Sequence, residues 1–168
     1  MAQAASLFQL GMDLGCEPRK AQAEVFSSDV SHVAAYQAPA NDERKDYFIA
    51  RDGKVFAGTH LIIDLWGAER LDDLEHVEQT LVKAIEEAKA TLLHIHLHHF
   101  TPNGGISGVA VLAESHISIH TWPEKGYAAL DVFMCGHAEP HKAIPVLESA
   151  FCPSRTDVDE ILRGEETP

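Results

Sequence analysis

Ser115 stands between a carboxylate and an imidazole, in the segment Glu114-Ser115-His116. A serine hydroxyl attacks a carbonyl carbon when a neighbouring base accepts its proton, and His116 or His120 could be that base. The sequence has no Gly-x-Ser-x-Gly motif, however, and in an unbroken strand Ser115 and His120 point to opposite faces. The residues therefore argue against an ordinary hydrolase triad, unless the chain is sharply bent or cut between Glu114 and Ser115.

Cys135 is a second candidate for chemistry, because it closes an apolar segment immediately before Gly136. A buried, inert thiol is the usual outcome for such a cysteine, but a thiol that ionises near neutral pH can also transfer a proton. The other cysteines are Cys16 and Cys152. An odd number with no Cys-x-x-Cys pair argues against a disulfide framework and against a structural zinc site.

Three histidines alternate along one predicted strand, His94, His96 and His98, and His99 follows them. Imidazole is the commonest protein ligand for metals, so this strand face could hold an ion. A closed site would also need a fourth ligand and groups that orient the imidazoles, and the sequence suggests neither. A solvated face or an active-site wall rich in histidine is the alternative interpretation, and no metal is expected.

Hydrophobic periodicity predicts the elements that must position these groups. Two short apolar runs around Asp52-Gly53 predict a hairpin, 59–66 is a predicted strand, and apolar residues at three- and four-residue steps predict an amphipathic helix over 69–90. Further strands are predicted over 91–100, 106–113, 115–122, 127–136 and 156–164, with a helix over 139–151 that Pro145 weakens. This order of strands and helices along the chain, joined by short connections, predicts an α+β fold. The fold would be a two-layer α/β sandwich with a mostly antiparallel sheet and helices packed on one face.

Composition narrows the class of protein. The chain has 168 residues, enough for one domain with a sizeable core, which we place at 46–168 behind a weakly patterned N-terminal extension, 1–45. A formal net charge of −13 disfavours nucleic acid as a partner and suits a cationic small molecule. With no apolar run of about 18 residues and no signal-peptide pattern at the N-terminus, we expect a cytoplasmic protein with no membrane partner.

The segment 107–136, SGVAVLAESHISIHTWPEKGYAALDVFMCG, closely resembles the signature of the prokaryotic S-adenosylmethionine decarboxylases, the pyruvoyl enzymes of polyamine synthesis. The resemblance also includes HHFTPNGG ahead of this segment. It implies that the proenzyme cleaves itself between Glu114 and Ser115, after attack of the Ser115 hydroxyl on the Glu114 carbonyl. Ser107 and His120 are then the processing residues, with His120 as the proton acceptor, and Ser115 becomes a pyruvoyl group.

The same resemblance implies the reaction and its substrate. S-adenosyl-L-methionine would form a Schiff base with the pyruvoyl group and lose CO₂, and Cys135 would donate the proton that replaces it. Phe100 would stack on the adenine, with His120 on the other side, and Glu124 would bind the ribose hydroxyls. The product would serve spermidine synthesis, and the enzyme would be a homodimer of cleaved protomers or a larger assembly.

Three other interpretations remain open from the sequence. The same scaffold could decarboxylate ornithine or arginine, although Phe100 and Glu124 are residues that only a nucleoside substrate needs. The chain could be an uncleaved, non-catalytic regulatory homologue, although Ser115, His120 and Cys135 are all present. A metal-binding histidine protein is the third interpretation, and only the segment HIHLHH supports it.

Overall fold

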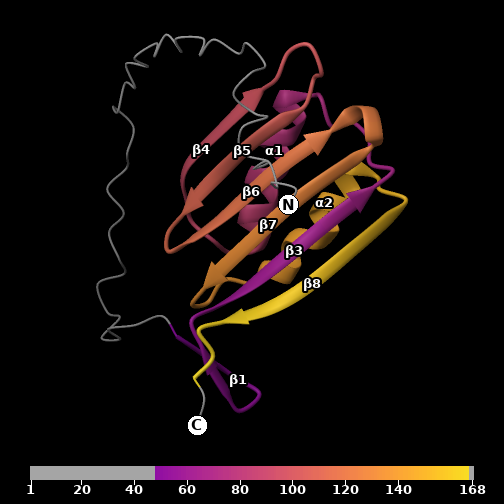
Figure 1. Ribbon diagram of the computed structural model, residues 1–168. Coiled ribbons are helices and arrows are strands. Elements are labelled where there is room, and N and C mark those ends of the chain that lie inside the picture. The colour runs from indigo at the N-terminus through magenta and orange to yellow at the C-terminus, as the bar shows by residue number, and fades with distance from the viewer. Residues whose placement is uncertain (1–47, 167–168) are drawn as a thin grey trace, which may run out of the picture. The chain divides into compact units, whose positions relative to one another are not determined.

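A six-stranded antiparallel sheet backed by two helices dominates the computed structural model, which describes residues 48–166 (Figure 1). The strand order is β4-β5-β6-β7-β3-β8, and every neighbouring pair is antiparallel. The strands are β3 (Gly58–Trp66), β4 (Leu92–His99), β5 (Ile106–Leu112), β6 (Ser115–Trp122), β7 (Tyr127–Cys135) and β8 (Arg155–Arg163). The helices are α1 (Leu74–Glu87) and α2 (Ala143–Phe151), with short 3₁₀ turns η1 (Pro123–Lys125) and η2 (Pro140–Lys142). The predicted α+β sandwich is confirmed.

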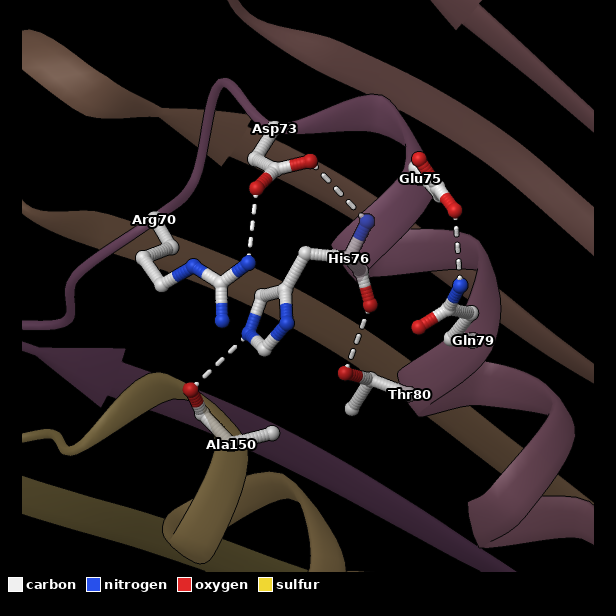
Figure 2. A network of polar contacts seen from close by, with 7 residues as sticks. All are labelled: Arg70, Asp73, Glu75, His76, Gln79, Thr80 and Ala150. Carbon is white, nitrogen blue, oxygen red and sulfur yellow. Dashed lines mark hydrogen bonds and ion pairs between the residues drawn. The ribbon is translucent and has the colours of Figure 1, made fainter.

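Helix α1 is shorter than predicted at both ends, and its caps explain why. Asp73 has an extended backbone, and its carboxylate accepts a hydrogen bond from the His76 N–H at 3.0 Å, so the helix begins after it (Figure 2). Arg70, three residues earlier, has a left-handed φ of 57° and cannot continue a helix. At the other end Lys89 also has a positive φ, 58°. The buried stripe on α1 consists of Val77, Thr80, Leu81, Ala84 and Ile85.

Helix α2 tolerates Pro145 because the proline lies in the first turn. The N–H groups of a first turn have no partner within the helix, so the missing proline N–H breaks no hydrogen bond. The helix contacts α1 through His76, whose Nε2 lies 2.9 Å from the Ala150 carbonyl oxygen (Figure 2). The His76 ring also meets the Phe151 ring edge-on, with the two centroids 5.5 Å apart. Both helices therefore form one layer, which covers one face of the sheet (Figure 1).

The two faces of the sheet differ sharply in composition. Along β6 the side chains of Ile117 and Ile119 are fully buried toward the helices, whereas His116, Ser118 and His120 alternate with them on the other side. We call this second side the open face, because no helix within residues 48–166 covers it (Figure 1). Ser107, His120 and Cys135 lie on the open face, whereas the side chain of Ser115 points to the helix-covered face.

A two-stranded hairpin, β1 (Ile49–Arg51) and β2 (Lys54–Phe56), precedes the sheet and confirms the turn predicted at Asp52-Gly53. Both turn residues have positive φ, 53° and 77°, as a tight hairpin turn requires. Ion pairs Arg51–Glu160 at 2.7 Å and Lys54–Glu165 at 2.9 Å hold the hairpin against the end of the chain.

The predicted extension, 1–45, lies outside the described residues, so the boundary at 45 stays a prediction. Neither of the described helices combines the length and the apolar composition that a bilayer crossing requires.

Candidate active site

Ser115 and Cys135 meet where β6 begins and β7 ends. The backbone N–H of Cys135 donates a hydrogen bond to Ser115 Oγ at 3.2 Å, and Ser115 is only 9% exposed. The preceding residue, Glu114, has a left-handed φ of 62° in the tight β5–β6 connection. A non-glycine residue in this region stores about 1–2 kcal/mol of strain. The peptide bond predicted to break therefore follows a strained residue and adjoins a fixed hydroxyl.

Cys135 has the environment of an acid rather than of a nucleophile. Burial raises the pKa of its thiol, and the negative charge of Glu114 raises that pKa further. Its side chain lies on the open face beside that of Phe133, two residues earlier on β7. A thiol with a raised pKa stays protonated at neutral pH and has a proton to give.

Ser107 and His120 form a second pair at the other end of β6. They are direct partners in the β5–β6 register, and Ser107 Oγ lies 2.9 Å from His120 Nδ1. A pocket of about 190 Å³ opens beside them. It is lined by Phe100, Asn103, Gly105, Ser107, Thr121, Trp122 and Glu124. The structure thus brings four of the predicted residues, Ser107, His120, Phe100 and Glu124, to one end of the sheet.

The two pairs do not meet within one chain. Ser115 and His120 are separated by five residues on β6, which is about 16 Å at roughly 3.3 Å per residue. The side chains also point to opposite faces, as the alternation in the sequence predicts, since Ser115 is buried and His120 is exposed. A single protomer therefore holds two separate pairs, Ser115–Cys135 at one end of β6 and Ser107–His120 at the other. We call them half-sites because the resemblance assigns all four residues to one enzyme.

A polar chain across the open face was missed in the sequence, because its members come from four strands. Arg163 lies 3.2 Å from His60 Nδ1, His60 Nε2 lies 3.3 Å from Asp131 Oδ1, and Ser118 donates to Asp131 Oδ2 at 3.0 Å. A guanidinium can only donate, so Nδ1 accepts and Nε2–H donates to Asp131. The only indication of this polar chain in the sequence was the polar side chains of His60 and Asp64, which alternate with apolar residues along β3.

An aromatic row on the same face was missed for the same reason. Tyr127 stacks on Trp66 at 4.4 Å and on Trp122 at 5.2 Å, which links β3, β7 and β6. Trp122 also lines the pocket beside Ser107. Only the strand register brings these rings together.

His94, His96 and His98 project from β4 on the open face, and all three are exposed. Among residues 48–166, no group of three or more His, Cys, Asp or Glu side chains is arranged to hold a metal ion. His98 instead contacts Phe100, with the two ring centroids 4.5 Å apart.

The chain is similar to proteins of one enzyme family. Residues 59–164 match the family described as S-adenosylmethionine decarboxylase. A relative from Thermomicrobium roseum, named S-adenosylmethionine decarboxylase proenzyme, is 48% identical over 108 residues, which are 64% of this chain and 93% of the relative. A relative of the same name from Methanococcus maripaludis strain C7 is 52% identical over 110 residues, covering 64% of this chain and 89% of its own.

A solved structure is similar as well. The crystal structure of the adenosylmethionine decarboxylase from Aquifex aeolicus VF5 superposes with a TM-score of 0.58 and 35% identity, over 65% of this chain and 92% of that one. The family match covers more than half of the chain and includes both half-sites. The chain therefore belongs to the S-adenosylmethionine decarboxylase family, a family of carboxy-lyases.

Proposed function

We propose that this chain is a proenzyme that cleaves itself between Glu114 and Ser115 and then decarboxylates S-adenosyl-L-methionine with a pyruvoyl group made from Ser115. One observation carries the proposal. Ser115 directly follows Glu114, which has a left-handed backbone, and the Ser115 hydroxyl accepts a hydrogen bond from the Cys135 N–H at 3.2 Å. The word proenzyme in the names of the relatives supports the cleavage step. The product would enter spermidine synthesis in the cytoplasm.

Cleavage uses groups that the chain itself supplies. The Ser115 hydroxyl attacks the Glu114 carbonyl carbon, and the peptide bond is exchanged for an ester as the nitrogen leaves Glu114. A base then removes the Cα proton of Ser115, and elimination releases the Glu114 carboxylate. Hydrolysis of the remaining dehydroalanine releases ammonia and leaves a pyruvoyl group at the new terminus. We assign the base to His120, held by Ser107, and strain at Glu114 favours the first step.

The surroundings of Ser115 suit such a group, because its side chain is shielded from water and adjoins Cys135. Bound there, a pyruvoyl group supplies a carbonyl that accepts electrons from the substrate as CO₂ departs. Cys135, whose pKa is raised, donates a proton to the substrate Cα.

The pocket at the Ser107 end suits a nucleoside. Phe100 provides an aromatic surface for the purine, and the Glu124 carboxylate can accept hydrogen bonds from ribose hydroxyls. The net charge of −13 favours a sulfonium cation over an anionic substrate. These contacts distinguish S-adenosyl-L-methionine from ornithine and arginine, which lack a nucleoside.

We also propose that the enzyme is a homodimer in which two open faces pack against each other in opposite directions. This arrangement places the Ser107–His120 pair of one protomer over the end of β6 in its partner, where the backbone of Ser115 lies beside Cys135. The separation of the half-sites along β6 supports it, as do the exposed apolar side chains of Ile62, Val111 and Trp122 on the open face. Each dimer would then hold two complete sites.

An intact-mass measurement tests the cleavage. We expect the purified chain to give fragments 1–114 and 115–168, the second with a pyruvoyl terminus, and we expect Ser115→Ala to stay whole. The cleaved protein should release CO₂ from S-adenosyl-L-methionine and not from ornithine or arginine. An uncut wild-type chain, or CO₂ released only from the other amino acids, would contradict the proposal.

Co-expression tests the shared site. A His120→Ala chain keeps its own Ser115, so in a mixed dimer it takes His120 from a Ser115→Ala partner and should be cut. Each variant expressed alone should stay whole. A mixture in which no chain is cut, although mixed dimers form, would show that each site lies within one protomer.

A further inference from the structure

Phe100 is a large aromatic side chain at the exposed end of β4. It is 48% exposed, and its backbone is fixed by two hydrogen bonds, from its own N–H to the Gly105 carbonyl and from the Gly104 N–H to its carbonyl, both at 2.8 Å. The backbone of Phe100 is therefore fixed, whereas its half-exposed ring has few neighbours that restrict its rotation. An unrestricted ring loses rotamer freedom when a ligand stacks on it, and that loss weakens binding.

One ring contact limits this freedom. The imidazole of His98 lies 4.5 Å from the Phe100 ring, centroid to centroid, with the two planes at 71°. This is the edge-to-face geometry that aromatic pairs prefer. His98 is itself placed by the sheet, because it is the register partner of Ser107, which is hydrogen-bonded to His120.

We infer that His98 is a positioning residue for the nucleoside of the substrate, acting through Phe100. It holds the Phe100 ring in one orientation at the mouth of the pocket that Phe100 and Ser107 line, so the purine meets a ring that is already ordered. The inference rests on the proposed function, since it assigns Phe100 to the purine. It concerns binding, and His98 takes no part in cleavage or in proton transfer.

The other histidines of the same strand provide internal controls. His96 and His94 lie two and four residues further from Phe100 along β4, opposite Val109 and Val111. They share the exposure of His98 and its place on the open face. The three histidines of the segment HIHLHH therefore differ in role, and only His98 is expected to affect nucleoside binding through Phe100.

The test compares His98→Ala and His98→Phe with His94→Ala and His96→Ala. The readouts are KM and kcat for S-adenosyl-L-methionine and the dissociation constant of 5′-methylthioadenosine, an uncharged nucleoside, measured by calorimetry. We expect His98→Ala to raise KM and the dissociation constant by about two- to tenfold, with kcat and the extent of self-cleavage unchanged. His98→Phe keeps an aromatic edge and should restore both constants, while the two controls should match the wild type.

Several results would overturn the inference. One is an equal change in KM and in the dissociation constant for His98→Ala and His96→Ala. Another is a fall in kcat for His98→Ala with KM unchanged. A third is a His98→Phe variant that binds the nucleoside no better than His98→Ala. The nucleoside titration separates this inference from the proposed function. A wild type that binds the nucleoside but releases no CO₂ contradicts the proposed reaction alone, whereas equal nucleoside affinities of wild type and His98→Ala contradict the role of His98 alone.

Discussion

The N–H of Cys135 donates a hydrogen bond to the Oγ of Ser115, which joins the last residue of β7 to the first residue of β6. One contact between neighbouring strands thus fixes both the hydroxyl assigned to cleavage and the thiol assigned to proton donation. Because the contact uses the Cys135 backbone, the thiol itself remains available. The same pairing also brings the thiol close to Glu114, whose charge raises the thiol pKa.

The first prediction concerns that thiol. In a chain with Ser115→Ala, Cys16→Ser and Cys152→Ser, alkylation of Cys135 by iodoacetamide should rise with pH around a midpoint above the ordinary thiol pKa. Burial is the larger cause and Glu114 the smaller, so Glu114→Gln should lower the midpoint without removing the whole shift. Alkylation is followed by peptide mass.

The raised pKa of Cys135 also determines how the rate of decarboxylation should change with pH. A raised pKa keeps the thiol protonated, so decarboxylation that needs this proton is lost as pH rises through the raised value. A Cys135 midpoint at or below that of free cysteine would contradict its assignment as the acid.

The second prediction concerns Tyr127, whose hydroxyl donates to Asp64 at 2.6 Å. This hydrogen bond, with burial and the charge of Asp64, raises the pKa of Tyr127 to about 12. In a chain with Tyr36→Phe and Tyr47→Phe, absorbance near 295 nm should therefore rise around pH 12, and Asp64→Asn should move the rise toward pH 10. The stabilisation from this bond is fully present below about pH 10 and is lost between about pH 10 and 12. A rise near pH 10 in both proteins would refute the contact.

The third prediction concerns Thr121, which is buried below the pocket. Its hydroxyl accepts from the Ile106 N–H and donates to the Leu71 carbonyl, both at 2.8 Å. Thr121→Val leaves both backbone groups without this partner, so urea unfolding should show a loss of about 2 kcal/mol. Thr80→Val is the matched control, because its hydroxyl donates to a helical carbonyl and its loss should cost less than about 1 kcal/mol. Equal losses would show that the Thr121 link is unimportant.

The fourth prediction concerns the start of α1. The Arg70 guanidinium 2.7 Å from Asp73, and then the His76 N–H, lower the pKa of the Asp73 carboxyl (Figure 2). Asp73→Ala should lower the melting temperature at pH 7, and Asp73→Asn should lower it less, because an amide oxygen still caps the helix. Acidification through the lowered pKa protonates the carboxylate, so the gap between wild type and Asp73→Asn should close at low pH. A gap that does not change with pH would exclude the ion pair as its cause.

Most of the fold was predictable, because alternation and helical spacing are local. The strands from β3 to β8 lie within about two residues of their predicted ranges, and the hairpin at Asp52-Gly53 is present. The two helices were predicted too long. Asp73 caps α1, so the helix begins at Leu74 although the predicted range begins at 69, and Pro140–Lys142 form the separate turn η2 before α2. Caps depend on a few dihedral angles that apolar periodicity does not encode.

The site was predictable in its residues and not in its geometry. The resemblance named Ser107, Ser115, His120 and Cys135, and the strand register supplies the pairs Ser107–His120 and Ser115–Cys135. Alternation along β6 already indicated that Ser115 and His120 point to opposite faces of the sheet. Their pairing with Cys135 on β7 and with Ser107 on β5 needs the strand order as well. The polar chain through His60 and Asp131 depends on β3 lying beside β7, a pairing of segments far apart in sequence.

The strand order has a consequence for the proposed cleavage. A cut after Glu114 assigns β3, β4 and β5 to the first fragment and β6, β7 and β8 to the second. Across the sheet the two fragments alternate: β4 and β5 come from the first, β6 and β7 from the second, β3 from the first and β8 from the second. Each fragment keeps one pair of neighbouring strands, but every strand neighbour of β3 and of β8 belongs to the other fragment, so the fragments can separate only if the sheet unfolds. Folding before the cut is a unimolecular event, whereas refolding of denatured, cleaved protein is a bimolecular reaction whose rate depends on concentration. Maturation would thus remove the ability of the chain to refold alone, and the enzyme would keep its active form for as long as the interleaved sheet remains intact.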